Sequence, residues 1–179
     1  MDWVIETPRL GLRRLESGDL PALRAFLGDP EVMYAWEHGF SDEEIREWIE
    51  KNRSRYAREG YSYFAAIEKE SGKLIGVMGP LVETIDGADH VGIAYILARD
   101  YWGRGFAAEG GRASMEYGFG ALGAERVIAE IRPENLASRR VAERLGMKVT
   151  GQFVKTVYGK EMPHLIYSRE KNEGRLRNE

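Results

Sequence analysis

A short glycine-bearing loop between Leu97 and Ala107 is the part of this sequence whose residue types and spacing most suggest chemistry. It contains Gly103-Arg104-Gly105, follows a β-prone apolar run and precedes a helix-prone stretch. A helix N-terminus leaves backbone N–H groups without partners and carries about half a positive charge, and glycine allows a ligand to approach the backbone closely. The loop therefore predicts a cradle for a phosphate group.

Three other interpretations of this loop compete with a phosphate cradle. The first is a tight turn with two structural glycines. The second is a dinucleotide-binding fingerprint, because Gly103 to Ala108 fits G-x-G-x-x-A. The bulky Tyr101-Trp102 pair, the mid-chain position and the roughly 75 residues that remain argue against a doubly wound dinucleotide domain. A P-loop is excluded, because no Gly-Lys-Ser or Gly-Lys-Thr follows.

The composition excludes several kinds of site. The sequence has no cysteine, which rules out disulfides, thiolate nucleophiles, iron–sulfur clusters and zinc fingers. The histidines, His38, His90 and His164, are too widely spaced for a local metal motif, so we expect no metal. Lys plus Arg total 26 and Asp plus Glu 29, and the formal net charge of −3 gives no support to a nucleic-acid or membrane partner.

The elements that must position the loop form one expected domain over residues 1–170, followed by a charged tail over 171–179. Periodicity and turn residues predict helices that start at Ser17, Ser41, Gly103 and Asn135. They also predict strands over residues 9–15, 61–67, 73–82, 90–97, 126–131, 147–158 and 163–168. Hairpins followed by βαβ units indicate a mixed sheet covered by helices, an α/β or α+β fold.

The N-terminus and the apolar runs carry a prediction about location. No basic region followed by an apolar stretch opens the chain, and the longest apolar run, Val91 to Ala98, is too short to cross a membrane. We therefore expect a cytoplasmic protein, as a monomer or a homodimer.

Several separated segments resemble the GCN5-related N-acetyltransferases (GNAT). Tyr95 to Glu109 is similar to motif A of that family. Three further segments are similar to the RimJ/RimL-like branch of that family: Glu6 to Arg13, Pro133 to Ser138 and Glu143 to Met147. The resemblance implies the GNAT fold, a mixed, splayed sheet of about six or seven strands with about four helices. It also implies transfer of an acetyl group from acetyl-CoA to a primary amine.

The resemblance implies where acetyl-CoA binds. The diphosphate would lie on the loop amides of Trp102, Gly103, Arg104, Gly105, Phe106 and Ala107. The pantetheine arm would pair like an extra strand with Tyr95, Ile96 and Leu97. The matching Asn, here Asn135, contacts that arm, and the matching Ser, here Ser138, is the general acid of this branch. Asn and Ser are also favoured helix caps, so a structural role stays open for both.

The general base is not at its usual place in the family. Many members carry a Glu where Gly92 stands here, so the nearby candidates are Glu83, Asp86, Asp89 and His90, or water alone. Deprotonating a lysine-type amine at pH 7 costs roughly 4–5 kcal/mol, whereas an α-amine costs only about 1 kcal/mol. We therefore expect the α-amine of a protein or peptide N-terminus, or another small-molecule amine, as the acceptor.

The resemblance places the acceptor opposite the CoA, between the first two helices and the last hairpin. There Trp36 and Glu37 would hold a cationic amine by cation–π contact and charge, although Trp36 also fits a plain core cover. Attack on the thioester is then direct, in a ternary complex. The missing Glu at position 92 leaves one alternative, a non-catalytic acyl-CoA-binding or sensing protein on the same fold.

Overall fold

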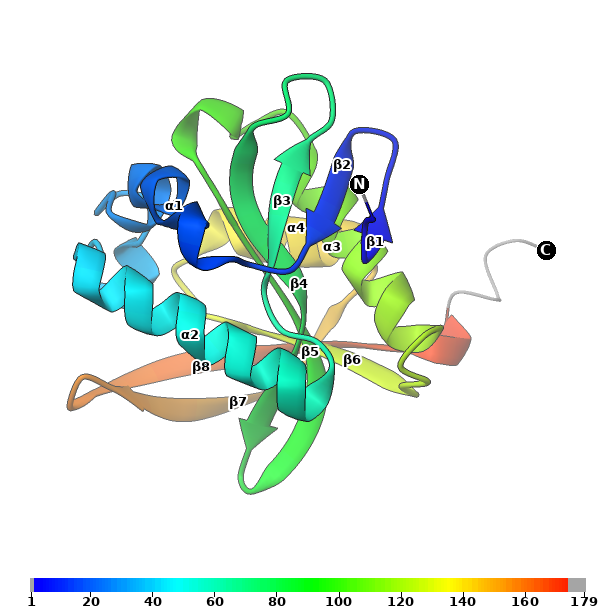
Figure 1. Ribbon diagram of the computed structural model, residues 1–179. Coiled ribbons are helices and arrows are strands. Elements are labelled where there is room, and N and C mark those ends of the chain that lie inside the picture. Colours follow the sequence, from blue (N-terminus) through cyan, green and yellow to red (C-terminus); the bar gives the residue numbers. More distant parts are fainter. Residues whose placement is uncertain (1, 174–179) are drawn as a thin grey trace.

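The strands of the computed structural model, which describes residues 2–173, form an eight-stranded sheet in the order β1-β2-β3-β4-β5-β6-β8-β7 (Figure 1). The strands are β1 Ile5–Glu6, β2 Leu10–Arg13, β3 Phe64–Glu68, β4 Leu74–Ile85, β5 Ala88–Leu97, β6 Arg126–Ile131, β7 Lys148–Val157 and β8 Lys160–Glu170. The helices are α1 Leu20–Leu27, α2 Asp42–Glu59, α3 Phe106–Phe119 and α4 Leu136–Arg144. Among the described residues, no helix is long and apolar enough to span a membrane.

The mixed, helix-covered sheet predicted from the sequence is confirmed, with one strand more than expected. The additional strand is β1, whose Ile5 and Glu6 pair with Leu12 and Gly11 of β2. A strand of two residues is too short to show apolar alternation, so periodicity does not reveal it. The predicted capping box of Ser41 and Glu44 begins α2. Ser17 instead opens a 3-10 turn.

The charged tail predicted over 171–179 lies mostly outside the described residues, which stop at 173. Residues 171–173 form a short 3-10 turn after β8. The domain boundary at residue 170 therefore stays a prediction.

The sheet splits between its two central strands. The parallel strands β5 and β6 pair only at Val91 with Val127 and at Gly92 with Ile128. Beyond these pairs, β5 continues to Leu97 against β4, while β6 continues against β8. The edge of β5 from Ile93 to Leu97 therefore has backbone groups with no strand partner on the side of β6. This is the splayed sheet that the family resemblance implied.

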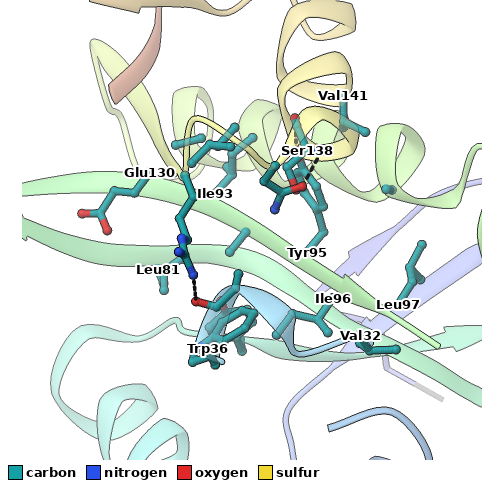
Figure 2. Close-up of a pocket in the computed structure, with 18 of the residues that line it drawn as sticks. Val32, Trp36, Leu81, Ile93, Tyr95, Ile96, Leu97, Glu130, Ser138 and Val141 are labelled. Atoms are coloured by element: carbon teal, nitrogen blue, oxygen red, sulfur yellow. Dashed lines mark hydrogen bonds between the residues drawn. The ribbon is translucent and has the colours of Figure 1, made fainter. Parts of the chain in front are cut away.

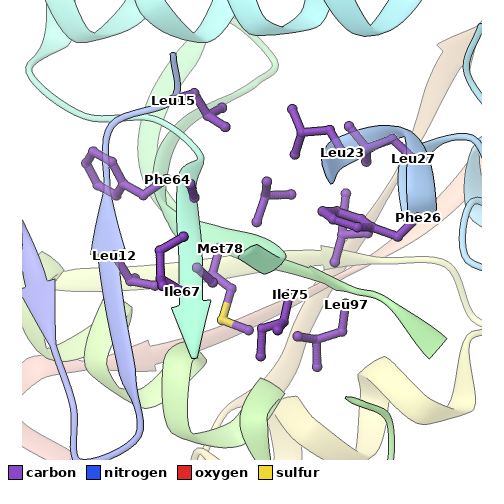
Figure 3. Packing of buried hydrophobic residues seen from close by; sticks show 14 of the residues in the cluster. Leu12, Leu15, Leu23, Phe26, Leu27, Phe64, Ile67, Ile75, Met78 and Leu97 are labelled. Carbon is purple, nitrogen blue, oxygen red and sulfur yellow. The ribbon is translucent and has the colours of Figure 1, made fainter. Parts of the chain in front are cut away.

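Two buried clusters hold the helices against the sheet. The larger joins β2, β3 and β4 to α1 and α2, and Figure 3 shows Phe26 and Leu23 of α1 facing Ile75 and Leu97. The smaller joins β6 and β8 to α3 and α4. Helix α3 packs so closely that a Cβ added at Gly110 would overlap Met78 Sδ on β4. Because α3 is fixed in this way, its N-terminus stays beside the split in the sheet.

Candidate active site

A cavity of about 1380 Å³ opens at the split in the sheet and brings together most of the predicted site residues (Figure 2). Those that line it are Tyr95, Ile96, Leu97, Trp102, Gly103, Gly105, Phe106, Ala107, Asn135, Ser138 and Trp36. Arg104 does not line it. Its guanidinium lies instead over the rings of Tyr101 and Phe106, 5.2 and 5.5 Å from their centroids.

The loop end of the cavity, from Gly103 to Ala108 with the free edge of β5, presents backbone groups. Gly103 and Gly105 have φ of 72° and 82°, left-handed values that favour glycine. Within the described chain, no backbone N–H from Gly103 to Ala108 donates to a protein acceptor. Unpaired donors at the positive end of α3 fit an anionic group such as a diphosphate.

Residues near the N-terminus brace this loop from outside the cavity. Arg9 donates from Nε to Glu109 at 2.8 Å and from Nη1 to the carbonyl of Arg104 at 3.0 Å. Its guanidinium also lies 4.1 Å from the centroid of the Phe106 ring. The hydroxyl of Thr7 donates to the same Glu109 at 2.6 Å, across 102 residues of sequence. The sequence matched Thr7 and Arg9 to the family but did not show this bracing role, because it depends on long-range contacts.

The free edge of β5 is linked to both neighbouring segments. The indole Nε1 of Trp102 donates to the carbonyl of Leu97 at 2.9 Å, which ties the loop to the end of the strand. The hydroxyl of Tyr95 donates to the carbonyl of Ser138 at 3.0 Å, which ties the strand to α4. Burial raises the pKa of Tyr95, so this hydroxyl stays protonated and in place.

Asn135 and Ser138 occupy different positions at the start of α4. Asn135 is the N-cap, and its Oδ1 accepts from the backbone N–H of Ser138 at 3.2 Å. The capping interpretation therefore holds for Asn135. Ser138 lies in the first turn, and its hydroxyl has no hydrogen-bond partner in the described part of the chain. Because Ser138 also lines the cavity, this hydroxyl is free to contact a ligand.

Glu83 of β4 and Glu130 of β6 line the opposite end of the cavity. The side chain of Glu83 lies across Gly92 of β5, where an added Cβ would overlap Glu83 Cγ. The glycine at position 92 thus leaves room for a carboxylate from the neighbouring strand. The other three candidates for the base lie outside the cavity lining, around the turn of the β4–β5 hairpin: Asp86, Asp89 and His90.

The charged end of the cavity consists of Glu83, Glu130, Lys51, Arg55 and Lys155. Burial and the neighbouring charges there shift the pKa of Glu83. Burial raises the pKa of Glu83 well above its usual value, and the nearby Glu130 raises this pKa further. Lys155 and Arg55 oppose that shift, and Lys155 Nζ lies 3.2 Å from Glu130 Oε2. When deprotonated, Glu83 is therefore a stronger base than an exposed carboxylate.

The structure separates the two residues predicted to hold the acceptor. Trp36 ends a 3-10 turn, Tyr34–Trp36, and lines the cavity. Glu37 is not part of the lining. Its carboxylate accepts from Lys160 Nζ at 2.8 Å and lies 3.7 Å from Arg132, and these contacts hold the pKa of Glu37 below its usual value.

One face of α2 contributes residues that the sequence analysis did not select. Trp48, Lys51, Asn52 and Arg55 all line the cavity. Their spacing of three and four residues places them on one side of a helix. That spacing was visible in the sequence, but only the structure shows that this face borders the cavity.

Residues 9–148 match the family model described as an acetyltransferase (GNAT) domain. The chain belongs to the GNAT acetyltransferase family. It is 34% identical over 166 residues to the protein YkkB of Bacillus subtilis, and the alignment covers 92% of this chain and 94% of YkkB. YnaD of the same organism, which is named an N-acetyltransferase, is 31% identical and covers 86% of this chain and 87% of its own.

Solved structures show the same fold. A GNAT-family acetyltransferase from Bacillus anthracis aligns with a TM-score of 0.79 and 27% identity, over 94% of this chain and 98% of that chain. RimL, a ribosomal L7/L12 α-N-protein acetyltransferase determined in complex with coenzyme A, aligns with a TM-score of 0.74 and 21% identity, over 92% and 95%. This GNAT protein is an acetyl-CoA-dependent acetyltransferase.

Proposed function

We propose that this GNAT enzyme transfers the acetyl group of acetyl-CoA to a primary amine by direct attack in a ternary complex. One observation carries the proposal: a single cavity joins the unpaired N–H groups of the α3 N-terminus to the buried carboxyl group of Glu83. The thioester of bound acetyl-CoA supplies the electrophilic carbonyl. Direct attack needs no protein nucleophile, and the sequence has no cysteine to supply a thiolate.

The loop end binds acetyl-CoA in this proposal. The N–H groups from Gly103 to Ala108 donate to the diphosphate oxygens, as helix N-termini do in other phosphate sites. A Cβ added at Gly103 would meet no protein atom, so the space beside this backbone is open to a ligand. The free edge of β5 from Tyr95 to Leu97 hydrogen-bonds to the amides of the pantetheine arm in the manner of an added strand.

Glu83 accepts the proton of the attacking amine, directly or through one water. The raised pKa of Glu83 lies closer to the pKa of an α-amine than the pKa of an exposed carboxylate does. The proton transfer is therefore less unfavourable. When Glu83 takes up the proton it loses its negative charge, and the neighbouring charges of Glu130 and Lys155 act on it in both states. The base of this enzyme thus comes from β4, while Gly92 on β5 leaves the space that its side chain occupies.

Ser138 hydrogen-bonds to the departing thiolate of coenzyme A and passes it a proton that water returns to the hydroxyl, so the serine ends the step protonated. Its hydroxyl is free of protein partners and lies in the first turn of α4, whose positive end also stabilises a developing anion. A thiol with an ordinary pKa of about 8.5 leaves readily, so the contribution of Ser138 is modest.

The acceptor is an α-amine, either of a protein or peptide N-terminus or of a small molecule. Its deprotonation costs only about 1 kcal/mol at pH 7, against roughly 4–5 kcal/mol for a lysine side chain. The alternative of a non-catalytic acyl-CoA-binding protein rested on the missing Glu at position 92. It loses that support, because Glu83 places a carboxylate over Gly92.

Release of free thiol from acetyl-CoA over a panel of amines tests this proposal. We expect release that depends on the acceptor and is fastest with α-amines. No release with any amine would favour the non-catalytic alternative. A clear preference for lysine side chains or polyamines would overturn the choice of an α-amine.

A further inference from the structure

The charged end of the cavity contains more positive charge than its carboxylates balance. Three cationic side chains, Lys51, Arg55 and Lys155, face two carboxyl groups, Glu83 and Glu130. Only Lys155 contacts one of these carboxylates, at 3.2 Å from Glu130. Burial raises the pKa of Glu83 and so favours its neutral form, which increases the positive surplus further.

Arg55 is the least satisfied of the three cations. Its Nε is closed to solvent and has no hydrogen-bond partner. Among the described residues, the side chain of Arg55 makes no hydrogen bond and no ion pair. Buried donors are normally paired, because leaving one unpaired costs free energy. Arg55 also lines the cavity, so the part of its guanidinium that faces the cavity is open to a ligand. A cation with no protein partner there points to an anionic group that the ligand supplies.

Lys51 lies one helical turn before Arg55 on the same face of α2. It also has no ion-pair partner among the described residues. Desolvation of the ammonium group and the like charges of Arg55 and Lys155 lower the pKa of Lys51, while Glu83 opposes that shift. Like charges placed this way repel one another. An anion bound between Lys51 and Arg55 would relieve this repulsion.

We propose that Lys51 and Arg55 form a subsite for a carboxylate of the acceptor. The inference rests on the proposed function, because it specifies the acceptor for the same site. Lys51, Arg55 and Glu83 line the same end of the cavity, so the acceptor's carboxylate and its amine bind close together. The acceptor is then an α-amino acid, or a peptide whose N-terminal residue carries a carboxylate side chain.

The same cations affect the amine that is to be acetylated. Positive charge near an ammonium group lowers its pKa, which favours the neutral, nucleophilic form. The cations also repel polyamines, which carry no anion to offset their own charge. The subsite therefore selects acceptors by the group beside the amine and prepares the amine for attack.

Matched acceptors and matched variants test the subsite. Thiol release is measured with α-amino acids against their C-terminal amides, and with amidated dipeptides that begin with Asp or Glu against those that begin with Asn or Gln. The enzymes are the wild type, Arg55→Gln, Lys51→Gln and Arg58→Gln. Arg58 is a control on the same helix, exposed and outside the cavity lining.

We expect the wild type to prefer the carboxylate-bearing member of at least one pair. Which pair responds tells a free amino acid from a peptide N-terminus. Arg55→Gln should raise KM for that acceptor roughly tenfold to a hundredfold, the usual range for losing a charge-assisted hydrogen bond. KM for acetyl-CoA and for the neutral acceptor should not change, and Lys51→Gln should act in the same direction with a smaller effect. Arg58→Gln should change none of these constants.

Two results would overturn the subsite while leaving amine acetylation intact. One is equal use of charged and neutral acceptors by the wild type. The other is an Arg55→Gln enzyme that loses the same amount of activity with the charged and the neutral acceptor and has a shifted pH profile. Arg55 would then act only as a counter-ion of Glu83.

If no amine is acetylated, the proposed function fails and binding alone decides about the subsite. Millimolar malonate, at constant ionic strength, should then raise the melting temperature of the wild type and of Arg58→Gln but not of Arg55→Gln. The absence of that difference would overturn the subsite.

Discussion

The loop end of the cavity presents mainly backbone groups, whereas the charged end presents side chains. The loop end uses backbone N–H groups of Gly103 to Ala108 and the free edge of β5. The charged end uses side chains from α2, β4, β6 and β7. A backbone site depends on conformation and so belongs to the fold, whereas a side-chain site depends on the individual residues. The comparison predicts that variants at the two ends affect different kinetic constants.

The largest expected effect is that of Glu83→Gln, which keeps the size of the side chain and removes the base. We expect kcat to fall by about 10²- to 10⁴-fold, the usual contribution of general base catalysis. KM for acetyl-CoA should stay unchanged, because Glu83 lies at the end opposite the loop. Thiol release with a saturating acceptor measures both constants.

The pH dependence of kcat gives a second signature of Glu83. The base must be deprotonated to act, so kcat of the wild type should rise with pH. Because burial and Glu130 raise the pKa of Glu83, the midpoint of that rise should lie well above the ordinary carboxyl value of 4.5. Glu83→Gln should lose this rise. The control Asp86→Asn, with the same charge change outside the cavity lining, should keep both the rate and the profile.

An intermediate effect is expected for Gly103→Ala at the loop end. Gly103 and Gly123 both have positive φ, 72° and 67°, and both have open space around an added Cβ, but only Gly103 lines the cavity. Both alanine variants should lose about 1–2 kcal/mol of unfolding free energy in urea, because left-handed backbone disfavours a Cβ. Only Gly103→Ala should weaken acetyl-CoA, by about tenfold. Equal affinity in the two variants would show that the diphosphate binds elsewhere.

The smallest effect is expected for Ser138→Ala. We expect kcat to fall by less than about tenfold, since a thiolate with a pKa near 8.5 leaves with little help. The melting temperature should not change, because Asn135, not Ser138, caps α4. Unchanged turnover in this variant would remove the general acid role.

The two ends also differ in how far the sequence predicts them. The glycines, the helix that follows and the preceding strand are neighbours in sequence, so local patterns were enough to predict the loop end. The split in the sheet followed from the family resemblance. The brace by Thr7 and Arg9 was missed, because it joins residues about 100 positions apart.

The charged end required the three-dimensional structure. Glu83 was one of four candidates for the base, and only the register of β4 and β5, with Glu83 opposite His90, places its side chain over Gly92. Glu37 lies in the predicted region, but its charge is already paired with Lys160, 123 residues away. Lys51 and Arg55 reach the cavity because α2 packs along its border, a long-range arrangement that no local pattern encodes.

Calorimetric titration of acetyl-CoA tests most directly the claim that the loop end binds the donor independently of the charged end. The titration compares the wild type, Gly103→Ala and Glu83→Gln. We predict one site per chain in the wild type, unchanged affinity in Glu83→Gln and about tenfold weaker binding in Gly103→Ala. No binding to the wild type, or affinity lost in Glu83→Gln and kept in Gly103→Ala, would contradict the account.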